Sequence, residues 1–369
     1  MTSKINLLSD CNIPFLNTFF DQPVSLELFD PDIGPQTDQL KKADALLIRT
    51  VTKVDEKMLR SAPELKIICS ATSGYDHMNF ALLKTHGIET RWASGCNAQS
   101  VAEYVASALI AWAEDHDEEL NHLTVGVVGA GHAGSATAQL LARLGCNCIA
   151  HDPPREEREP GWKGASIPEV LNCDILTLHV GLNQYPEYPT FHWLDEEKLK
   201  SGRAKLIINA SRGGVIDESA LKKHHVEWVL DVWENEPQVN PEIVLQSRIA
   251  TPHIAGYSRQ SKYRGTRMSA EAIYRFFGIN PELPDELRPK TELPDADMCQ
   301  STVEFLSELH PMFEFHQKMQ ETALENDPKQ RSSGFLKLRV AYPSPDEFAA
   351  LQFSESHRQK FPELAELFS

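Results

Sequence analysis

The residue types best suited to chemistry are an arginine, a glutamate and a histidine that each follow a short apolar run: Arg212, Glu236 and His253. A guanidinium can hold a carboxylate through two parallel hydrogen bonds and polarise a carbonyl that develops beside it. An imidazole can take the proton of a hydroxyl group and return it in the reverse reaction. A glutamate bonded to the second ring nitrogen would fix the tautomer of the imidazole. The three residues therefore predict oxidation or reduction at the hydroxyl carbon of a 2-hydroxy acid.

A glycine-rich segment lies upstream and has the spacing GxGxxG at Gly129, Gly131 and Gly134. It follows an apolar run and opens a predicted helix at Ala133–Leu144. In dinucleotide-binding folds, the first glycine permits a tight turn, the second lets the backbone approach the pyrophosphate, and the third allows a helix to pack closely on a strand. The amino end of the helix also attracts phosphate. The segment therefore predicts a dinucleotide site.

The acidic residue that such a site needs is Asp152, which follows the next predicted strand about 20 residues after the glycines. Its carboxylate can accept hydrogen bonds from both hydroxyls of a ribose and would repel a 2′-phosphate. NAD is therefore predicted as the cofactor rather than NADP. The alternative is that Asp152 only caps a turn or helix before Pro153 and Pro154.

The elements that must position these residues are short apolar runs that alternate with helical patterns up to about residue 280. This alternation predicts the α/β fold class, with two doubly wound parallel-sheet domains of the Rossmann or flavodoxin type. The runs are rich in Val, Ile and Leu, as expected of strands buried on both faces. Ligands bind beyond the carboxyl ends of such strands, so Arg212, Glu236 and His253 should meet at one edge. The predicted strands are Ile5–Leu8, Leu26–Phe29, Ala45–Ile48, Leu65–Ser70, Val125–Val128, Asn147–His151, Ile175–His179, Leu206–Asn209, Glu227–Val232 and Ile249–Thr251.

Two further long helices are predicted. Ser100–Asp115 carries a single apolar stripe, with Ser100 as the N-cap and Glu103 completing a capping box. The second helix, Arg259–Phe277, ends at Gly278.

Beyond that glycine, prolines among acidic residues predict a linker, and a small C-terminal α+β domain should follow. Its helices are predicted around Met298–Leu309 and Met312–Leu324, and a strand at Phe335–Tyr342. This tail is interpreted as an oligomerisation module, the alternative being an appendage packed on the surface. The expected domains are a substrate-binding (lid) domain at residues 1–98 with 259–285, an NAD-binding domain at 99–258 and a dimerisation domain at 286–369.

Four motifs, in order along the chain, resemble those of the D-isomer-specific 2-hydroxyacid dehydrogenases. Within that family, the first residues of the chain, Gly256-Tyr257 and the extra C-terminal segment resemble the erythronate-4-phosphate dehydrogenases of vitamin B6 biosynthesis. One departure is that Val180 stands where the family usually has a threonine that could donate a hydrogen bond. The four motifs are Gly129-Ala-Gly-His-Ala-Gly134, Asn209-Ala-Ser-Arg-Gly213, Asp231-Val-Trp-Glu-Asn-Glu-Pro237 and Thr251-Pro-His-Ile-Ala-Gly256.

The resemblance implies roles for particular residues. Arg212, Glu236 and His253 would be catalytic, with His253 the proton donor in reduction, and Thr50, Thr72 and Tyr257 would contact the substrate. A homodimer is also implied, with the tail helping to form its interface. The implied cofactor-binding residues are Gly129, Gly131, His132, Ala133, Gly134, Asp152, Ser211, Asp231 and Gly256.

The charge balance bears on the substrate. With 36 basic and 53 acidic residues, the chain carries a formal net charge of −17, which disfavours binding to nucleic acids and anionic membranes. A phosphorylated substrate therefore needs a local basic cluster. Arg49, which follows a predicted strand, is the first candidate for the phosphate, and Lys262 with Arg264 is the second.

Cysteine usage and the amino terminus bear on the compartment. The seven cysteines are odd in number and include no CxxC pair, which favours reduced thiols and no zinc site. The first residues lack the apolar core of a signal peptide, so a cytoplasmic protein is expected.

Three functions remain open from the sequence. The favoured one is NAD-dependent oxidation of 4-phospho-D-erythronate. The second is the same chemistry on another acid, such as 3-phosphoglycerate, glyoxylate or hydroxypyruvate. The third is an NAD-sensing binding protein like the corepressors that share this fold, which turnover measurements would distinguish.

Overall fold

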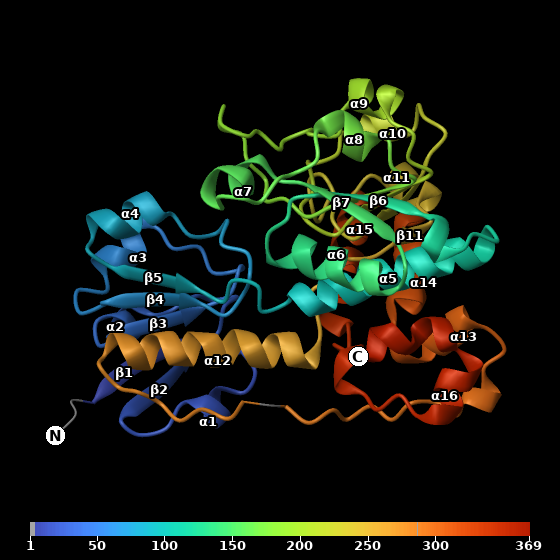
Figure 1. The fold of residues 1–369 in the computed structure, drawn as a ribbon. Coiled ribbons are helices and arrows are strands. Elements are labelled where there is room, and N and C mark those ends of the chain that lie inside the picture. Colours follow the sequence, from blue (N-terminus) through green and yellow to red (C-terminus); the bar gives the residue numbers. More distant parts are fainter. Residues whose placement is uncertain (1–3, 286) are drawn as a thin grey trace. The chain divides into compact units, whose positions relative to one another are not determined.

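The computed structural model describes residues 4–285 and 287–369, which form two compact units (Figure 1). The first unit comprises Met1–Asn97 and Arg259–Arg288, and the second Ala98–Ser258 and Pro289–Ser369. The tail therefore clusters with the second unit, while its role as a dimerisation domain stays a prediction.

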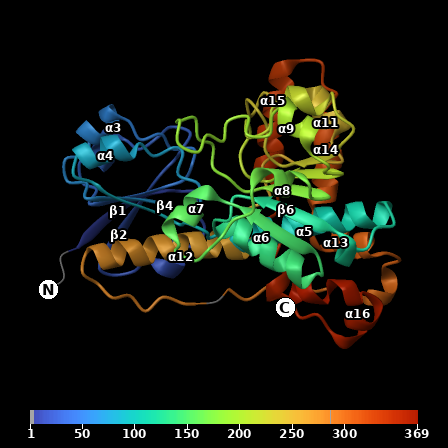
Figure 2. The ribbon, with the colours of Figure 1, turned by 45° about the horizontal axis from the view of Figure 1, so that its top comes forward.

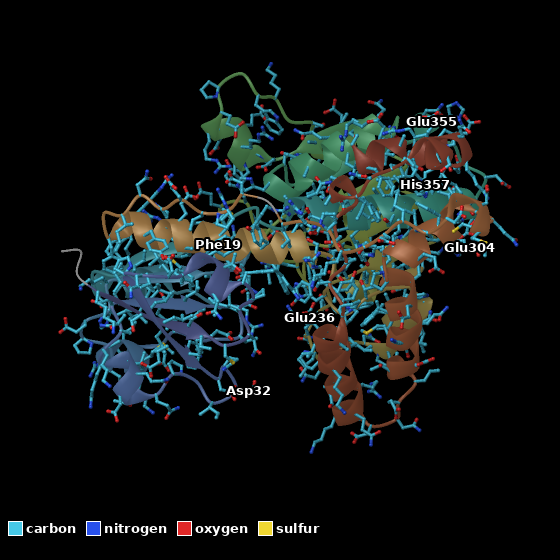
Figure 3. All side chains as sticks on the ribbon, turned by 90° about the horizontal axis from the view of Figure 1, so that it is seen from below. Phe19, Asp32, Glu236, Glu304, Glu355 and His357 are labelled. Atoms are coloured by element: carbon cyan, nitrogen blue, oxygen red, sulfur yellow. The ribbon has the colours of Figure 1, made fainter. Side chains whose placement is uncertain are left out.

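The first unit is a parallel sheet with helices on both faces. Its elements are β1 (Ile5–Asp10), α1 (Leu16–Phe19), β2 (Val24–Phe29), α2 (Thr37–Leu40), β3 (Ala45–Ile48), α3 (Glu56–Arg60), β4 (Ile67–Ser70), α4 (Phe80–Thr85), β5 (Glu89–Trp92) and α12 (Arg259–Phe276). The strands lie in the order β2-β1-β3-β4-β5. Side chains of α1 and α12 cover one face, and those of α2, α3 and α4 cover the other. Phe19, labelled in Figure 3, lies with its ring centroid 4.8 Å from that of Tyr263 on α12.

The second unit is built on a six-stranded parallel sheet with the order β11-β10-β9-β8-β6-β7. Its strands are β6 (Thr124–Val128), β7 (Asn147–His151), β8 (Ile175–Leu178), β9 (Leu206–Asn209), β10 (Glu227–Leu230) and β11 (Ile249–Ala250). Its helices are α5 (Ala98–Asp115), α6 (His132–Arg143), α7 (Pro153–Arg158), α8 (Ile167–Leu171), α9 (Glu196–Ser201), α10 (Glu218–Leu221), α11 (Pro241–Gln246), α13 (Thr302–Leu309), α14 (Met312–Ala323), α15 (Pro328–Ala341) and α16 (Glu355–Lys360).

Helices cover both faces of this second sheet as well. α5 and α6 pack on one face, and α8, α10 and α11 pack on the other. From the tail, α13 packs on α5, while α14 lies along the edge strand β11. Figure 2 shows α15 beside α14. Through α14, the tail is therefore attached to β11, the edge strand that precedes His253.

The predicted fold class is confirmed, because both sheets are parallel and doubly covered. Every predicted strand up to residue 251 is present, with ends shifted by at most two residues. β5 was not predicted, because its sequence Glu-Thr-Arg-Trp at the sheet edge is mostly polar and only partly buried. Across the described residues, no helix has the length and apolar character that a membrane span requires. None of the seven cysteines, which all lie among the described residues, forms a disulfide.

The predicted strand at Phe335–Tyr342 is wrong, and with it the α+β character of the tail, because these residues belong to α15 or directly follow it. Phe335 and Tyr342 are buried in two apolar clusters, and Leu338 between them packs against both. Their spacing of three and four residues is that of one helix face. A helix explains both the buried positions and the exposed Leu336 between them.

The predicted capping box at Ser100 is also wrong. α5 begins at Ala98, so Ser100 and Glu103 lie inside the helix, where each is less than 5% exposed. The hydroxyls of Ser100 and Ser258 both lie 2.8 Å from Oε1 of Glu347 in the tail. Glu103 Oε2 accepts a hydrogen bond of 2.9 Å from the backbone N–H of Phe348. These polar residues therefore attach the tail to α5 rather than cap the helix.

This contact makes stability depend on pH. Burial and the charge of Glu347 raise the pKa of Glu103 to about 8, whereas an unfolded glutamate titrates near its ordinary value of about 4.3. Between these values the folded chain holds a proton that the unfolded chain has lost, so this site favours folding less and less as pH rises. We expect Glu347→Gln to lower the pKa of Glu103 and to shrink the fall in melting temperature between pH 6 and pH 8.5. Glu355→Gln, at an exposed position of α16, is the control, and equal pH slopes in all three proteins would contradict the expectation.

Candidate active site

Three neighbouring strands of the second sheet end at the predicted catalytic residues. β9, β10 and β11 are adjacent and parallel, so Arg212, Glu236 and His253 follow the carboxyl ends of neighbouring strands. Glu236, labelled in Figure 3, lies on the loop after β10. The sheet therefore presents the three loops at one edge, as the sequence predicted.

The central feature is a histidine–carboxylate pair. His253 Nδ1 lies 2.8 Å from Oε2 of Glu236, and Oε1 of the same carboxylate accepts a 2.9 Å hydrogen bond from the backbone N–H of Trp233. A carboxylate only accepts, so Nδ1 carries the proton and Nε2 is left as the basic nitrogen. Both side chains are largely buried, at 28% exposed for His253 and 21% for Glu236.

The Glu236 carboxylate is held in its charged form. Burial alone would raise its pKa, but the charge of His253, the hydrogen bonds from His253 and Trp233 and the charge of Arg339 lower it below its ordinary value. The carboxylate can therefore stabilise a positive charge that develops on the imidazole.

A second buried carboxylate shapes the loop that carries His253. Asp231 is 1% exposed and accepts hydrogen bonds from Thr251 Oγ1 at 2.7 Å and from the backbone N–H groups of Ile254 at 2.7 Å and Ala255 at 2.9 Å. His253 itself has a positive φ of 59° and donates its backbone N–H to the carbonyl of Asp231 at 2.8 Å. Asp231 thus holds the histidine backbone in an uncommon conformation, and its predicted contact with NAD stays a prediction.

Arg212 lies on a loop whose conformation is stabilised by hydrogen bonds with the side chain of Asn209. Asn209 Nδ2 donates to the carbonyl of Arg212 at 3.0 Å, and its Oδ1 accepts from the hydroxyl of Ser211 at 2.8 Å. The next residue must be glycine, because a Cβ at Gly213 would lie 1.8 Å from the carbonyl oxygen of Trp233. The loops after β9 and β10 therefore touch, which fixes Arg212 relative to the Glu236 loop.

We expect Arg212→Lys to lower kcat/KM roughly 10²-fold, because a lysine keeps the charge but loses the two parallel hydrogen bonds to a carboxylate. Steady-state kinetics should show both a higher KM and a lower kcat. Arg203→Lys, an exposed position in the same unit, is the matched control. An Arg212→Lys variant with more than half of the wild-type activity would show that bidentate binding is not needed.

The glycine loop fits a dinucleotide. Gly129 has φ +89°, and a Cβ there would lie 2.7 Å from the carbonyl of His179 and from Val180. A Cβ at Gly134 would lie 1.8 Å from the carbonyl of Gly129, so both positions require glycine. At Gly131, the N-cap of α6, a Cβ would meet nothing within 4 Å. This open space at a helix amino end is where the motif places a pyrophosphate.

The residues flanking the loop are placed consistently with that role. His132 is exposed, and Ala133 is half-buried in the first turn of α6. Val180 packs its side chain beside Gly129 and provides no polar group there. Burial lowers the pKa of His179 to about 4, so this histidine behind the loop is neutral.

Asp152 both caps α7 and ties it to the glycine loop. Its Oδ1 accepts from the backbone N–H of Arg155 at 2.9 Å, and its Oδ2 accepts from the backbone N–H of Ala130 at 2.7 Å. The Arg155 guanidinium in turn donates to the carbonyl of Ala130 at 2.9 Å and to Ser135 Oγ at 3.0 Å. Asp152 therefore does cap a helix, as the alternative interpretation held. Its contact with the ribose of NAD stays a prediction.

We expect Asp152→Ala to raise the KM for NAD roughly 10- to 100-fold, since charged hydrogen bonds are lost. The variant should also show a smaller preference for NAD over NADP. With the Asp152 carboxylate gone, its repulsion of a 2′-phosphate is lost, and the nearby guanidinium of Arg155, which also pairs with Glu159, offers that phosphate a positive charge. Asp195→Ala removes an equivalent N-cap from α9 and should leave the NAD/NADP ratio unchanged. An unchanged ratio in Asp152→Ala would leave this residue with the capping role alone.

The first unit gathers its predicted substrate residues at the carboxyl ends of β3 and β4. Thr50 is exposed and follows Arg49, while Thr72 Oγ1 lies 2.7 Å from Ser70 Oγ. Arg49 is paired with the buried Asp10 through Nε at 2.8 Å and Nη2 at 3.3 Å.

The second candidate cations for the phosphate also belong to the first unit. Burial and the charge of Arg49 lower the pKa of Lys262. Arg264 donates its Nε to the carbonyl of Cys96 at 2.8 Å, so part of its fork is used by the backbone. Arg49 and Lys262 are therefore close enough for their charges to interact, and Arg49 is also paired with Asp10.

One residue near the site was missed. Arg339 on α15 donates its Nε to the hydroxyl of Tyr257 at 3.2 Å, and its charge lowers the pKa of Glu236. Arg339 was not singled out because a strand was predicted at its position. No spacing in the sequence connects Arg339 with His253.

Comparisons with known proteins agree with this geometry. The family model described as "D-isomer specific 2-hydroxyacid dehydrogenase, NAD binding domain" matches residues 98–255. A protein of Idiomarina loihiensis named erythronate-4-phosphate dehydrogenase is 41% identical over 281 residues, which is 74% of each chain. A protein of Marinobacter nauticus with the same name is 36% identical over 363 residues, which is 94% of each chain.

Solved structures show the same fold at lower identity. The D-lactate dehydrogenase of Aquifex aeolicus, complexed with NAD and lactic acid, has a TM-score of 0.59 and 24% identity, over 74% of this chain and 95% of that one. The NAD-bound 3-phosphoglycerate dehydrogenase of Entamoeba histolytica has a TM-score of 0.60 and 19% identity, over 77% and 100%. The family model over residues 98–255 and the relatives at 36% and 41% identity over 94% and 74% of this chain show that the chain belongs to the D-isomer-specific 2-hydroxyacid dehydrogenase family.

Proposed function

We propose that this chain oxidises 4-phospho-D-erythronate with NAD to (R)-3-hydroxy-2-oxo-4-phosphooxybutanoate, a step in the biosynthesis of pyridoxal 5′-phosphate. The observation that carries the chemistry is the 2.8 Å pair of His253 and Glu236. These residues lie on the loops after β11 and β10, beside β9, whose loop carries Arg212, and the same sheet includes β6, which precedes the glycine loop. The choice of substrate is supported by relatives that are 36–43% identical and named for this activity.

The oxidation removes a hydride from C2 and a proton from its hydroxyl. Bound NAD supplies the hydride acceptor. Arg212 holds the substrate carboxylate and polarises the carbonyl as it forms. His253 accepts the hydroxyl proton on Nε2, and Glu236 keeps the Nδ1 proton in place and stabilises the resulting imidazolium. In reduction the same imidazolium returns the proton.

The residues that would hold NAD are those of the glycine loop and the strand ends beside it. The free N–H groups at the start of α6 would bind the pyrophosphate, and Asp152 the adenosine ribose. Ser211, Asp231 and Gly256 are proposed as further contacts. For the substrate we propose Thr50, Thr72, Tyr257 and Arg49, the last of these with Lys262 beside it.

We also propose a cytoplasmic homodimer, with the tail contributing to its interface. The proposal is supported by the family resemblance and by the apolar residues that α15 leaves exposed, Leu336 at 48% and Val340 at 87%. Light scattering of the purified chain would measure the mass, and a monomer at micromolar concentration would contradict it.

The test is a panel of 2-hydroxy acids with NAD, followed by the absorbance of NADH. The panel contains 4-phospho-D-erythronate, D-erythronate, 3-phosphoglycerate and glycolate, with hydroxypyruvate and glyoxylate for the reverse reaction with NADH. We expect the highest kcat/KM for 4-phospho-D-erythronate. A higher value for another acid would reassign the substrate, and NAD binding without any turnover would favour a sensor protein.

A further inference from the structure

An arginine from the C-terminal tail lies beside the catalytic residues, in the same unit. Arg339 Nε donates to Tyr257 Oη at 3.2 Å, and its guanidinium lies 5.8 Å from the centroid of the Tyr257 ring. Its charge also contributes to the lowered pKa of Glu236. Tyr257 follows His253 by four residues on the loop after β11, so Arg339 reaches the loop that carries the proposed base.

Helix α15 is anchored, which fixes this arginine in place. Phe335, one turn before it, is 1% exposed in the core with α11 and β10. Tyr342, just after the helix, is 4% exposed and packs its ring at 5.0 Å from Phe315 of α14. α14 is itself bound to the sheet edge, since His316 Nδ1 accepts a 3.0 Å hydrogen bond from the backbone N–H of Ala250 in β11.

The guanidinium keeps most of its hydrogen-bonding capacity. Throughout the described residues, no carboxylate lies within 4.0 Å of Arg339, and Nη1 and Nη2 have no protein acceptor. The arginine is nevertheless only partly exposed. A half-buried guanidinium without a counter-ion, in a chain of net charge −17, is suited to an anion that arrives with the substrate.

We propose that Arg339 is a substrate-binding residue that the tail contributes to the active site, where it binds the substrate's phosphate together with the Tyr257 hydroxyl. The inference rests on the proposed function. Arg212 is committed to the carboxylate, and Arg49, the first candidate for the phosphate, is paired with Asp10, so the phosphate at the other end of a four-carbon acid needs a further cation. The Nη1 and Nη2 groups of Arg339 supply two parallel donors for phosphate oxygens, and the tail thereby selects phosphorylated acids.

The test compares 4-phospho-D-erythronate with D-erythronate as substrates of the full chain, with NAD. We expect Arg339→Ala to raise the KM for the phosphorylated acid roughly 10²-fold, as lost charged hydrogen bonds require, and to change the KM for D-erythronate by less than about threefold. Inorganic phosphate should compete with the phosphorylated acid in the wild type and far less in the variant. Arg339→Lys should recover part of the loss for the phosphorylated acid alone.

Lys337→Ala, which removes an exposed cation from the same helix, is the control and should behave as the wild type. NAD affinity, measured by titration, should be equal in all variants and reports their folding. Equal losses on both acids, or no loss on either, would overturn the role of Arg339. A wild type that does not oxidise 4-phospho-D-erythronate would instead overturn the proposed function, so the two failures are distinguishable.

Discussion

His253→Asn should lower turnover by roughly 10²- to 10⁴-fold, the usual contribution of a positioned general base. An asparagine is the informative replacement because the backbone at this position has φ 59°, which asparagine tolerates better than other residues except glycine. The backbone N–H bond to the Asp231 carbonyl can then persist, and the loop keeps its shape. Only the proton acceptor is lost.

Stopped-flow or steady-state absorbance of NADH measures the loss, and titration with NAD measures whether the glycine loop is intact. We expect an NAD affinity close to that of the wild type, since His253 lies after β11 and the loop lies after β6. His310→Asn changes a buried histidine of the same unit that lies outside the site, and controls for general destabilisation. A His253→Asn variant that retains most of its turnover would end the proposed role in proton transfer.

The strand ends were predictable because their residues are determined locally. Buried parallel strands require continuous apolar runs, and the residue after such a run lies at the sheet edge wherever the sheet forms. The position of Arg212, Glu236 and His253 after three neighbouring strands could therefore be predicted from the sequence, while their catalytic roles stay predictions. The glycines were predictable for the same reason, since a Cβ at Gly129 or Gly134 would collide with backbone.

The tail was not predictable in the same way. Ser100 and Glu103 have the pattern of a helix cap, but their partners are Glu347 and Phe348, more than 240 residues away in sequence. A local capping signal cannot compete with burial against a distant segment, and nothing near Ser100 in the sequence reveals that segment. Arg339 was missed for a related reason, because its role depends on how α15 packs rather than on any motif.

Glu236→Gln should lower turnover roughly 10³- to 10⁴-fold, because it places the histidine proton on the wrong nitrogen. The carboxylate accepts two hydrogen bonds, from Trp233 N–H on Oε1 and from His253 Nδ1 on Oε2. A glutamine has one oxygen and one amide nitrogen, so it cannot accept both. If its oxygen stays on Trp233, its NH₂ group faces Nδ1 and donates to it. The imidazole proton then moves to Nε2, which can no longer accept the substrate hydroxyl proton.

The pH profile separates this mechanism from simple destabilisation. With the negative charge of Glu236 removed, the protonated imidazole loses its counter-charge, so the limb of the residual activity that the histidine sets should move to lower pH. Glu234→Gln is the matched control, because Glu234 lies on the same loop but pairs with His192. That variant should keep the wild-type profile and most of its turnover. Suppose that Glu236→Gln keeps the wild-type pH profile and loses less than about tenfold in turnover. The Glu236 carboxylate then neither orients the His253 imidazole nor stabilises its positive charge, and the base must be held by the Asp231 loop alone.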